Sequence, residues 1–260
     1  MTNHADDLDL ALTLADEADA ITLSRFQAID LHVTSKPDNT PVSDADTAVE
    51  SMIRARLAGA RPTDAVIGEE EGAVGDADRR WILDPVDGTK NYIRGGVVWA
   101  TLIGLEVDDR IVAGVVSAPA MGRRWWARLG GGAWTRTPDG AIRQISASGV
   151  GQLSDAFMSF ASLEGWTEQD RLGPFLNLAS RVWRTRAYGD FWSHMMVAEG
   201  SVDLAAEPIV NLWDLAALQI IVEEAGGRFT DHAGIATSYN GTVLSTNGHL
   251  HDEALEILKG

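Results

Sequence analysis

The hexapeptide at residues 84–89, with the sequence DPVDGT, constrains this chain more than any other segment. It directly follows the apolar run at residues 81–83, which is typical of a buried strand. Because Pro85 has no N–H to donate to a central ladder, we expect the chain to turn there. Asp84 and Asp87 would then lie together at a strand end, where like charges repel unless a cation lies between them. The segment therefore predicts a cation site.

The charge balance limits the classes of partner. The 260 residues include 21 Lys and Arg against 38 Asp and Glu, a net charge of −17, and no Cys. A nucleic-acid surface needs clustered cations, so we expect no nucleic-acid partner. No apolar stretch approaches the roughly 20 residues that span a bilayer, and the first residues lack the pattern of a signal peptide. We therefore expect a cytoplasmic protein without a membrane partner, a disulfide or a thiolate zinc site.

Periodicity and turn signals divide the chain into two lobes. Helices are expected over residues 6–26, 43–59, 168–180, 190–199, 212–225 and 252–258, and a loop is expected over 36–41. Strands are expected over residues 65–68, 81–83, 98–107, 111–117, 124–128, 133–135, 157–160, 182–188, 202–206, 228–230 and 243–246. We expect an α+β lobe over 1–147 with most of the metal ligands. An α/β lobe over 148–260 would carry the specificity residues and the last metal ligand.

Acidic residues lie at the ends of three predicted elements. They are Glu69 after one strand, the pair Asp84 and Asp87 after the next, and Asp214 at the start of a helix capped by Asn211. Mg²⁺ prefers oxygen ligands, and bound cations would supply the positive field that an acidic protein needs for an anionic substrate. Each acid taken alone has a simpler interpretation as a solvated loop residue, and Asp214 would also suit the helix dipole.

The Gly88-Thr89 step offers backbone N–H groups at a turn that opens a helical turn. Such a nest binds anions, which favours a phosphate site. The Thr89 hydroxyl would orient a nucleophilic water, or it would serve only as a helix cap.

Four segments carry a resemblance to a known family. They are TPVSDAD at residues 40–46, GEE at 68–70, WILDPVDGTKNY at 81–92, and WD at 213–214 followed by EAGG at 224–227. In this order they resemble the inositol monophosphatase superfamily, whose members are metal-dependent phosphomonoesterases. The resemblance covers nearly the whole chain. It implies an α+β fold of the layered αβαβα type, with two closely packed lobes, and a homodimer as the smallest assembly.

The resemblance also implies roles for the residues at matching positions. The implied ligands of about two to three Mg²⁺ ions per active site are Glu69, Asp84, the Val86 carbonyl, Asp87 and Asp214. The implied catalytic residues are Glu69, Thr89 and Asp46, with Thr89 placing the attacking water and Asp46 near an outer metal. The implied substrate contacts are Gly88, Thr89, Asp190, Glu207 and Asp214.

Two acids in the second lobe bear on the substrate. Asp190 follows RAYG at residues 186–189, and Glu207 opens EPIVNLWD at 207–214; both segments resemble the histidinol-phosphate phosphatase branch. Histidinol phosphate has a cationic amine and an imidazole, which suit carboxylates placed away from the metals. The alternatives are that Asp190 caps a helix or pairs with Arg186, and that Glu207 accepts hydrogen bonds from inositol hydroxyls.

The expected function is Mg²⁺-dependent hydrolysis of L-histidinol phosphate to L-histidinol and phosphate, a step of histidine biosynthesis, with a metal-activated water. One alternative is an inositol-1-phosphate or broad-specificity sugar-phosphate phosphatase. Another is a non-catalytic module that binds phosphorylated ligands.

Overall fold

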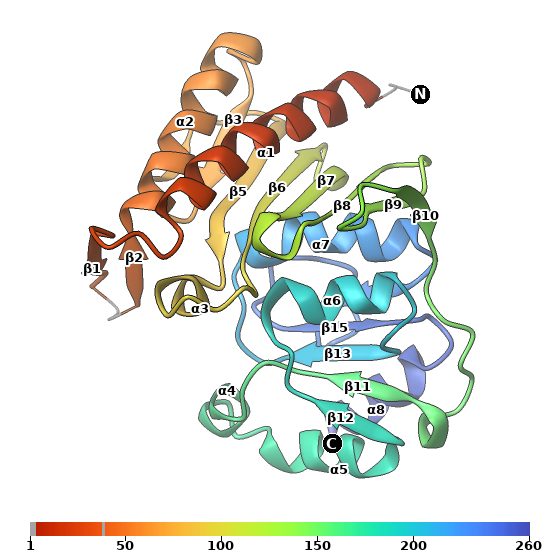
Figure 1. The fold of residues 1–260 in the computed structure, drawn as a ribbon. Coiled ribbons are helices and arrows are strands. Elements are labelled where there is room, and N and C mark those ends of the chain that lie inside the picture. The colour runs from red at the N-terminus through yellow and green to blue at the C-terminus, as the bar shows by residue number, and fades with distance from the viewer. Residues whose placement is uncertain (1–3, 38–39) are drawn as a thin grey trace.

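Helices and sheets alternate in five layers in the computed structural model, which describes residues 4–37 and 40–260 (Figure 1). Two helices cover an eight-stranded sheet, a second pair lies between that sheet and a five-stranded sheet, and three more helices close the far side. The expected layered αβαβα fold is confirmed. No helix in the described ranges combines the length and apolar character needed to cross a bilayer.

The first layer consists of α1 (Ala5–Arg25) and α2 (Asp44–Ala60). Ser43 begins α2 through the expected capping box with Asp46, which places the Asp46 carboxylate at the helix N-terminus. A hairpin of β1 (Val33–Ser35) and β2 (Pro41–Ser43) joins the two helices, and neither strand was expected. Residues 38 and 39 of the expected loop lie outside the described residues.

The large sheet has the strand order β10-β9-β8-β7-β6-β5-β3-β4. Its strands are β3 (Ala65–Gly68), β4 (Gly72–Val74), β5 (Arg79–Asp87), β6 (Ala100–Val107), β7 (Arg110–Ala118), β8 (Arg123–Arg128), β9 (Ala133–Arg136) and β10 (Ile142–Ile145). A short helix, α3 (Thr89–Ile93), follows β5, and one 3₁₀ turn (Pro119–Met121) follows β7.

The turn expected at Pro85 is wrong, because β5 runs through this residue to Asp87. The pairing with β3 ends at Leu83, so Pro85 needs no N–H on that side. On the β6 side the register shifts between Asp84 and Asp87. This bulge accommodates the proline inside the strand and re-aims the residues that follow it.

The central layer consists of α6 (Asp190–Ala198) and α7 (Leu212–Glu224). Every residue from Leu215 to Val222 is buried, as expected for a helix that lies between two sheets. Gly114 on β7 lets α7 approach closely, since a Cβ there would lie 2.6 Å from the Ala217 carbonyl oxygen. This contact fixes the position of α7, and with it the position of Asp214.

The second sheet has the strand order β12-β11-β13-β15-β14. Its strands are β11 (Phe157–Ser159), β12 (Arg184–Arg186), β13 (Leu204–Glu207), β14 (Arg228–Thr230) and β15 (Val243–Thr246), preceded by a 3₁₀ turn (Leu153–Asp155). Its outer face is covered by α4 (Glu164–Glu168), α5 (Leu172–Arg181) and α8 (His251–Lys259). The single helix expected over 168–180 is wrong because Pro174 is tolerated only in a first helical turn, so the chain breaks and α5 starts at Leu172.

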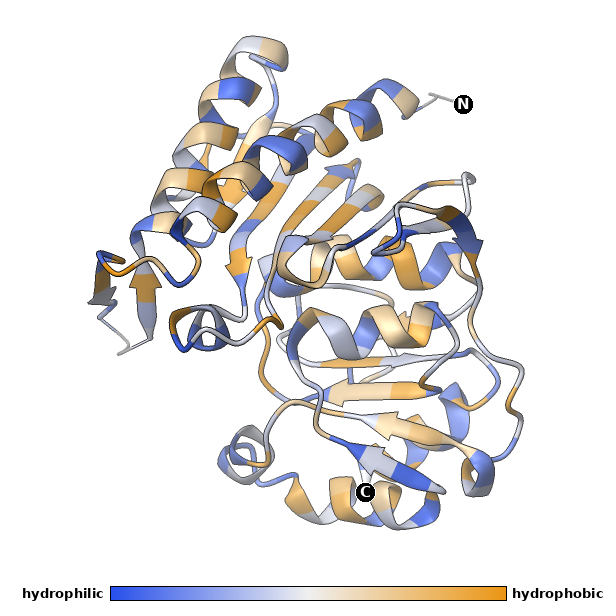
Figure 2. Ribbon diagram, viewed as in Figure 1, coloured by the Kyte–Doolittle hydropathy of each residue, from blue (hydrophilic) through white to orange (hydrophobic). Residues whose placement is uncertain are grey.

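Three apolar cores lie between the five layers, and Figure 2 shows the corresponding hydrophobic stripes on the strands and central helices. The division at residues 147 and 148 remains a prediction. The first sheet ends at Ile145 and the second begins at Phe157, but α7 of the later segment packs on the first sheet. The two parts therefore share one large apolar interface.

Candidate active site

Three carboxylates meet where β5 ends and α7 begins. One oxygen from each of Asp84, Asp87 and Asp214 lies within 4.8 Å of the others. Asp84 and Asp87 flank the bulge in β5, and Asp214 is in the first turn of α7. The sequence predicted this grouping, and such a set of oxygen donors fits a divalent cation.

Backbone N–H groups orient each carboxylate. Asp84 Oδ1 accepts a hydrogen bond from the Val86 N–H at 3.0 Å, and Asp87 Oδ2 accepts one from the Phe191 N–H at 2.8 Å. Asp214 Oδ2 accepts one from the Asn211 N–H at 2.7 Å. The second oxygen of each carboxylate accepts no hydrogen bond from the described residues. Each acid therefore keeps one oxygen free for a cation.

No Lys or Arg of the described ranges pairs with these three acids. Burial, followed by the charges of Glu69 and Asp87, raises the pKa of Asp84 well above its ordinary value. Burial and the charges of Asp190 and Asp214 do the same to the pKa of Asp87. Burial raises the pKa of Asp214 to about 7. The protein alone thus disfavours the ionised cluster, and a bound cation would restore it.

Glu69 lies beside this group and not within it. Its Oε1 pairs with Lys36 Nζ at 2.7 Å, and the same ammonium lies 2.8 Å from Glu70 Oε1. Burial raises the pKa of Glu70 to about 7, although Lys36 acts in the opposite direction. The contact of Lys36 with Glu69 could not be predicted from local sequence, because the position of Lys36 depends on the hairpin between α1 and α2.

Glu50 holds the loop that carries Glu69, a role that was not predicted from the sequence. Its buried carboxylate accepts hydrogen bonds from the Glu70 and Glu71 N–H groups at 2.8 and 2.9 Å. A Cβ at Gly68 would lie 2.1 Å from Glu50 Oε1, so a larger residue there would displace the Glu50 carboxylate from these hydrogen bonds. An acid on the buried face of α2, beside Ile53, was the signal that could have revealed this role.

Thr89 and Asp46 contact each other at the turn that follows β5. Thr89 Oγ1 lies 2.9 Å from the Val86 carbonyl oxygen and 3.2 Å from Asp46 Oδ1. Asp46 is fully buried and also accepts from the Ser43 N–H at 2.9 Å. Gly88 has a φ of 82°, and a Cβ there would lie 2.8 Å from the Val98 carbonyl oxygen. Both features require glycine at this turn.

Asp190 and Glu207 line a cavity of about 180 Å³ that also contains Asp87 and Asp214. Asp190 Oδ2 accepts a hydrogen bond from Asn91 Nδ2 at 2.9 Å. It follows the N-cap residue Gly189, and within the described residues it forms no ion pair with Arg186. Burial, followed by the charge of Glu207, raises the pKa of Asp190 to about 6.

Glu207 has a histidine partner inside the protein. Its Oε1 lies 3.1 Å from His194 Nε2, and His194 Nδ1 lies 2.7 Å from Ser245 Oγ. The His194 side chain is buried, and it orients Glu207. Asn91 was missed because its contact with Asp190 joins segments that only the packed lobes bring together.

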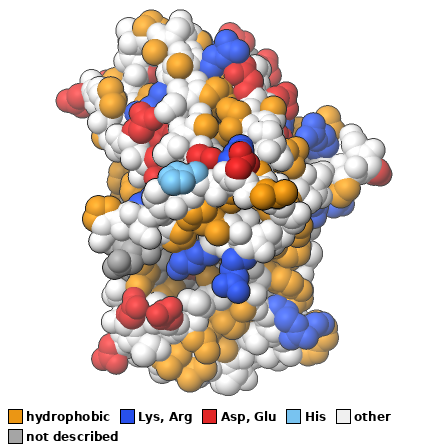
Figure 3. Space-filling view, turned by 60° about the vertical axis from the view of Figure 1, so that its left-hand side comes forward, with side chains coloured by type: hydrophobic (Ala, Val, Ile, Leu, Met, Phe, Trp, Pro, Cys, Tyr) orange, Lys and Arg blue, Asp and Glu red, His pale blue; other side chains and the backbone are white. Residues whose placement is uncertain are grey.

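The cavity continues into a groove between α3 and α4. One part is lined by Glu69, Gly88, Thr89, Lys90 and Asp190, and a further part is lined by Lys90, Glu164, Glu168 and Glu207. Figure 3 shows the face of the molecule on the α3 and α4 side, with basic side chains near its middle and acidic side chains above and below them. A ligand in this groove would meet both signs of charge.

Comparisons with known proteins agree with this arrangement. The sequence pattern of the inositol monophosphatase family matches residues 4–259. A histidinol-phosphatase of Streptomyces coelicolor is 55% identical over 99% of this chain and 98% of its own. A histidinol-phosphatase of Mycobacterium tuberculosis is 53% identical over 96% of both chains. The crystal structure of the extragenic suppressor protein suhB from Bartonella henselae superposes with a TM-score of 0.89, at 28% identity, over 98% of this chain and 99% of the other.

Proposed function

The chain belongs to the inositol monophosphatase family and is a phosphoric monoester hydrolase, and we propose that its substrate is L-histidinol phosphate. The products would be L-histidinol and inorganic phosphate, which places the reaction in histidine biosynthesis. The relatives named histidinol-phosphatase support this proposal, and the charges of the cavity give it a physical basis.

The pair Asp190 and Glu207 is the observation that carries the substrate assignment. Both carboxylates face the cavity beside Asp87, and within the described residues neither forms an ion pair with Lys or Arg; their partners are the Asn91 amide and the His194 imidazole. The amine of histidinol phosphate is cationic near neutral pH, and its imidazole is partly so. A carboxylate that forms no ion pair with Lys or Arg in the described residues would gain a charge-assisted hydrogen bond from this end of the substrate.

We propose that Mg²⁺ is held by Asp84, Asp87 and Asp214, with Glu69 and the Val86 carbonyl as further ligands, and that about two to three ions occupy each site. The free oxygen of each clustered aspartate and the absence of a cationic partner within the described residues fit this group. When bound, the cation would stabilise the charge that develops on the phosphoryl oxygens and on the leaving alkoxide.

The residues of the chain would then position the nucleophile and the phosphate. Thr89 Oγ1 can donate its proton to Asp46 or to the Val86 carbonyl oxygen, which leaves its lone pairs to accept a hydrogen bond from the attacking water. Glu69 would assist by accepting a proton from that water. The N–H groups of Gly88 and Thr89 would hold the phosphoryl oxygens. The water oxygen would bond to phosphorus as the ester P–O bond breaks. The leaving alkoxide would take a proton from a second water, and Glu69 would return the proton that it accepted to solvent.

A panel of phosphate esters with matched variants tests the substrate. Wild-type protein should have a higher kcat/KM for L-histidinol phosphate than for inositol 1-phosphate or p-nitrophenyl phosphate. Asp190→Ala should lower kcat/KM for histidinol phosphate by about 10- to 100-fold, the value of a hydrogen bond to a charged group, with a much smaller loss on p-nitrophenyl phosphate. Asp252→Ala on exposed α8 is the control. Equal turnover of the esters, or equal losses in Asp190→Ala, would contradict the assignment.

We propose in addition that the protein is a cytoplasmic homodimer. Family membership supports the assembly, and light scattering coupled to size-exclusion chromatography would test it. A mass near 28.0 kDa at micromolar concentration would contradict the dimer.

A further inference from the structure

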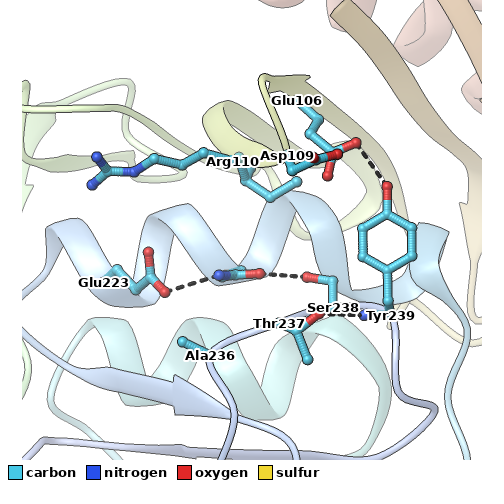
Figure 4. Close-up of a pocket in the computed structure, with 10 residues that line it drawn as sticks. Glu106, Asp109, Arg110, Glu223, Ala236, Thr237, Ser238 and Tyr239 are labelled. Atoms are coloured by element: carbon cyan, nitrogen blue, oxygen red, sulfur yellow. Dashed lines mark hydrogen bonds between the residues drawn. The ribbon is translucent and has the colours of Figure 1, made fainter. Parts of the chain in front are cut away.

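A second polar cavity, of about 280 Å³, lies at the other end of α7 from Asp214. It opens between the turn that joins β6 to β7, the last turns of α7, and the loop at residues 236–239 (Figure 4). Asp214 and Glu223 lie on the same helix, about 14 Å apart along its axis at about 1.5 Å per residue. The cavity is therefore separate from the active site but shares a rigid element with it.

Most of the polar groups in the wall of this cavity already have partners. Glu106 Oε2 accepts from Tyr239 Oη at 2.7 Å and pairs with Arg80 Nε at 2.7 Å, and Arg80 also pairs with Asp109. The buried floor is one hydrogen-bonded chain. Ser238 Oγ donates to Gln219 Oε1 at 2.6 Å, and Gln219 Nε2 donates to Glu223 Oε1 at 3.0 Å. The floor is thus built and rigid.

Two groups of opposite charge remain available to a ligand. The Arg110 guanidinium makes no hydrogen bond and no ion pair within 4.0 Å in residues 4–37 and 40–260, although its charge acts on Glu223. Glu223 Oε2 likewise accepts no hydrogen bond from the described part of the chain. Figure 4 shows Arg110 and Glu223 on the same side of the pocket, with Tyr239 and Glu106 at the opposite end.

Charge and size together limit the occupant. A simple anion would satisfy Arg110 and be repelled by Glu223, while a simple cation would do the reverse. A molecule that carries both charges on neighbouring atoms would satisfy both. The volume lies just below the range for drug-sized ligands, which suits a small metabolite. Ile111 and Ala236 give the wall an apolar stretch against which a short side chain can pack.

We propose that this cavity binds a free α-amino acid, with the α-carboxylate on Arg110 and the α-ammonium on Glu223. The site does not depend on the identity of the phosphate ester that the active site hydrolyses.

Calorimetric titration of the Mg²⁺-loaded full chain with each of the common free L-amino acids tests the proposal. At least one should bind. The methyl ester and the N-acetyl derivative of the tightest binder, which each lack one charge, should bind about tenfold more weakly or worse. The proposal would be overturned if none of the amino acids binds, or if both derivatives bind as tightly as the free amino acid.

Substitutions then locate the bound amino acid. Arg110→Ala and Glu223→Gln should each weaken binding by about tenfold or more, and unchanged phosphatase activity of Arg110→Ala would show that the variant is folded. Asp190→Ala in the active site and Arg143→Ala on exposed β10 are the controls and should bind as wild type does. Binding that survives both pocket substitutions, or that is lost in Asp190→Ala, would place the amino acid elsewhere and refute this site.

Discussion

Two groups of buried acids in this protein differ in where their countercharge comes from. The site cluster, defined as Asp84, Asp87 and Asp214, has no cationic partner in the described chain. The N-terminal network, defined as Asp7 and Asp64 with Arg61 and Arg79, is compensated internally. Arg79 Nη2 lies 2.9 Å from Asp7 Oδ1, and Arg79 Nε lies 3.2 Å from Asp64 Oδ1.

The pKa of Asp7 and the pKa values of the site cluster are shifted in opposite directions. Burial alone would raise the pKa of Asp7, but the hydrogen bonds and charges of Arg61 and Arg79 hold it below its ordinary value. In the site cluster burial and like charge act together, so the pKa values of Asp84 and Asp87 rise well above the ordinary value. Burial of an acid therefore marks a functional site here only where the chain leaves the charge uncompensated.

The largest effect on activity is expected from Asp87→Asn, which removes one carboxylate of the site cluster. Removing one ligand should lower kcat/KM by more than about 100-fold, since loss of an outer partner of a metal ligand already costs 10- to 100-fold. The same change removes one repelling charge, so the chelated protein should be at least as stable as wild type. Steady-state assays and thermal unfolding in EDTA measure both. If this variant retained wild-type activity, the site cluster would have no role in the reaction.

Arg79→Ala should break the N-terminal network and leave the reaction intact. The substitution leaves Asp64 and Asp7 with fewer partners, and the expected cost is about 2 kcal/mol of unfolding free energy, moderated because Arg79 is partly exposed. Denaturant unfolding measures this loss, with Arg143→Ala as a control of equal charge change. A large fall in kcat/KM at unchanged stability would show that the two acidic groups do not have separate roles.

The smallest expected effect is on the pH dependence of stability, in which the site cluster and the N-terminal network should differ in direction. Burial raises the pKa of Asp214 from 3.8 to about 7, so the folded state holds this proton more tightly than the unfolded state does. The resulting stabilisation is complete below about pH 4 and is lost as the pH rises to 7. The melting temperature in EDTA should therefore fall across this range, and the increase caused by Mg²⁺ should grow to at least about 3 °C by pH 8. The pKa of Asp7 is lowered in the folded state, so its contribution to stability has the opposite pH dependence and is lost only as the pH falls into the acid range.

An Mg²⁺-induced increase in melting temperature that is constant from pH 5 to 8 would contradict this interpretation. An increase that is unchanged in the Asp87→Asn variant would contradict it as well. The same titration on Asp252→Asn serves as a control, since this exposed acid on α8 lies outside the three-carboxylate group.

The grouping of the site cluster was predictable because each acid lies at the end of a recognisable element. The apolar run before Asp84 and the Asn211 cap before Asp214 both have local signals, and the β-α order brings them to one edge. The bulge in β5 was not predictable, because Pro85 fits inside the strand only where the β3 pairing has already ended. Local pattern contains no information on that register.

The supporting contacts depended on tertiary packing. Lys36 contacts Glu69 only because of a hairpin, and the two prolines in this segment had favoured a loop there. Asn91 contacts Asp190 only after the lobes have packed. Glu50 was the one member with a local signal, as an acid on the buried face of a helix. The residues that bear the chemistry could thus be predicted from sequence, and most of the residues that orient them could not.

The anomalous scattering of a crystal grown with Mn²⁺ in place of Mg²⁺ tests the central claim most directly. We expect a peak bonded to the free oxygens of Asp84, Asp87 and Asp214, and no peak at Asp7 or Asp64, where arginine already supplies the charge. A crystal of active protein with no peak among the three site carboxylates would contradict the account.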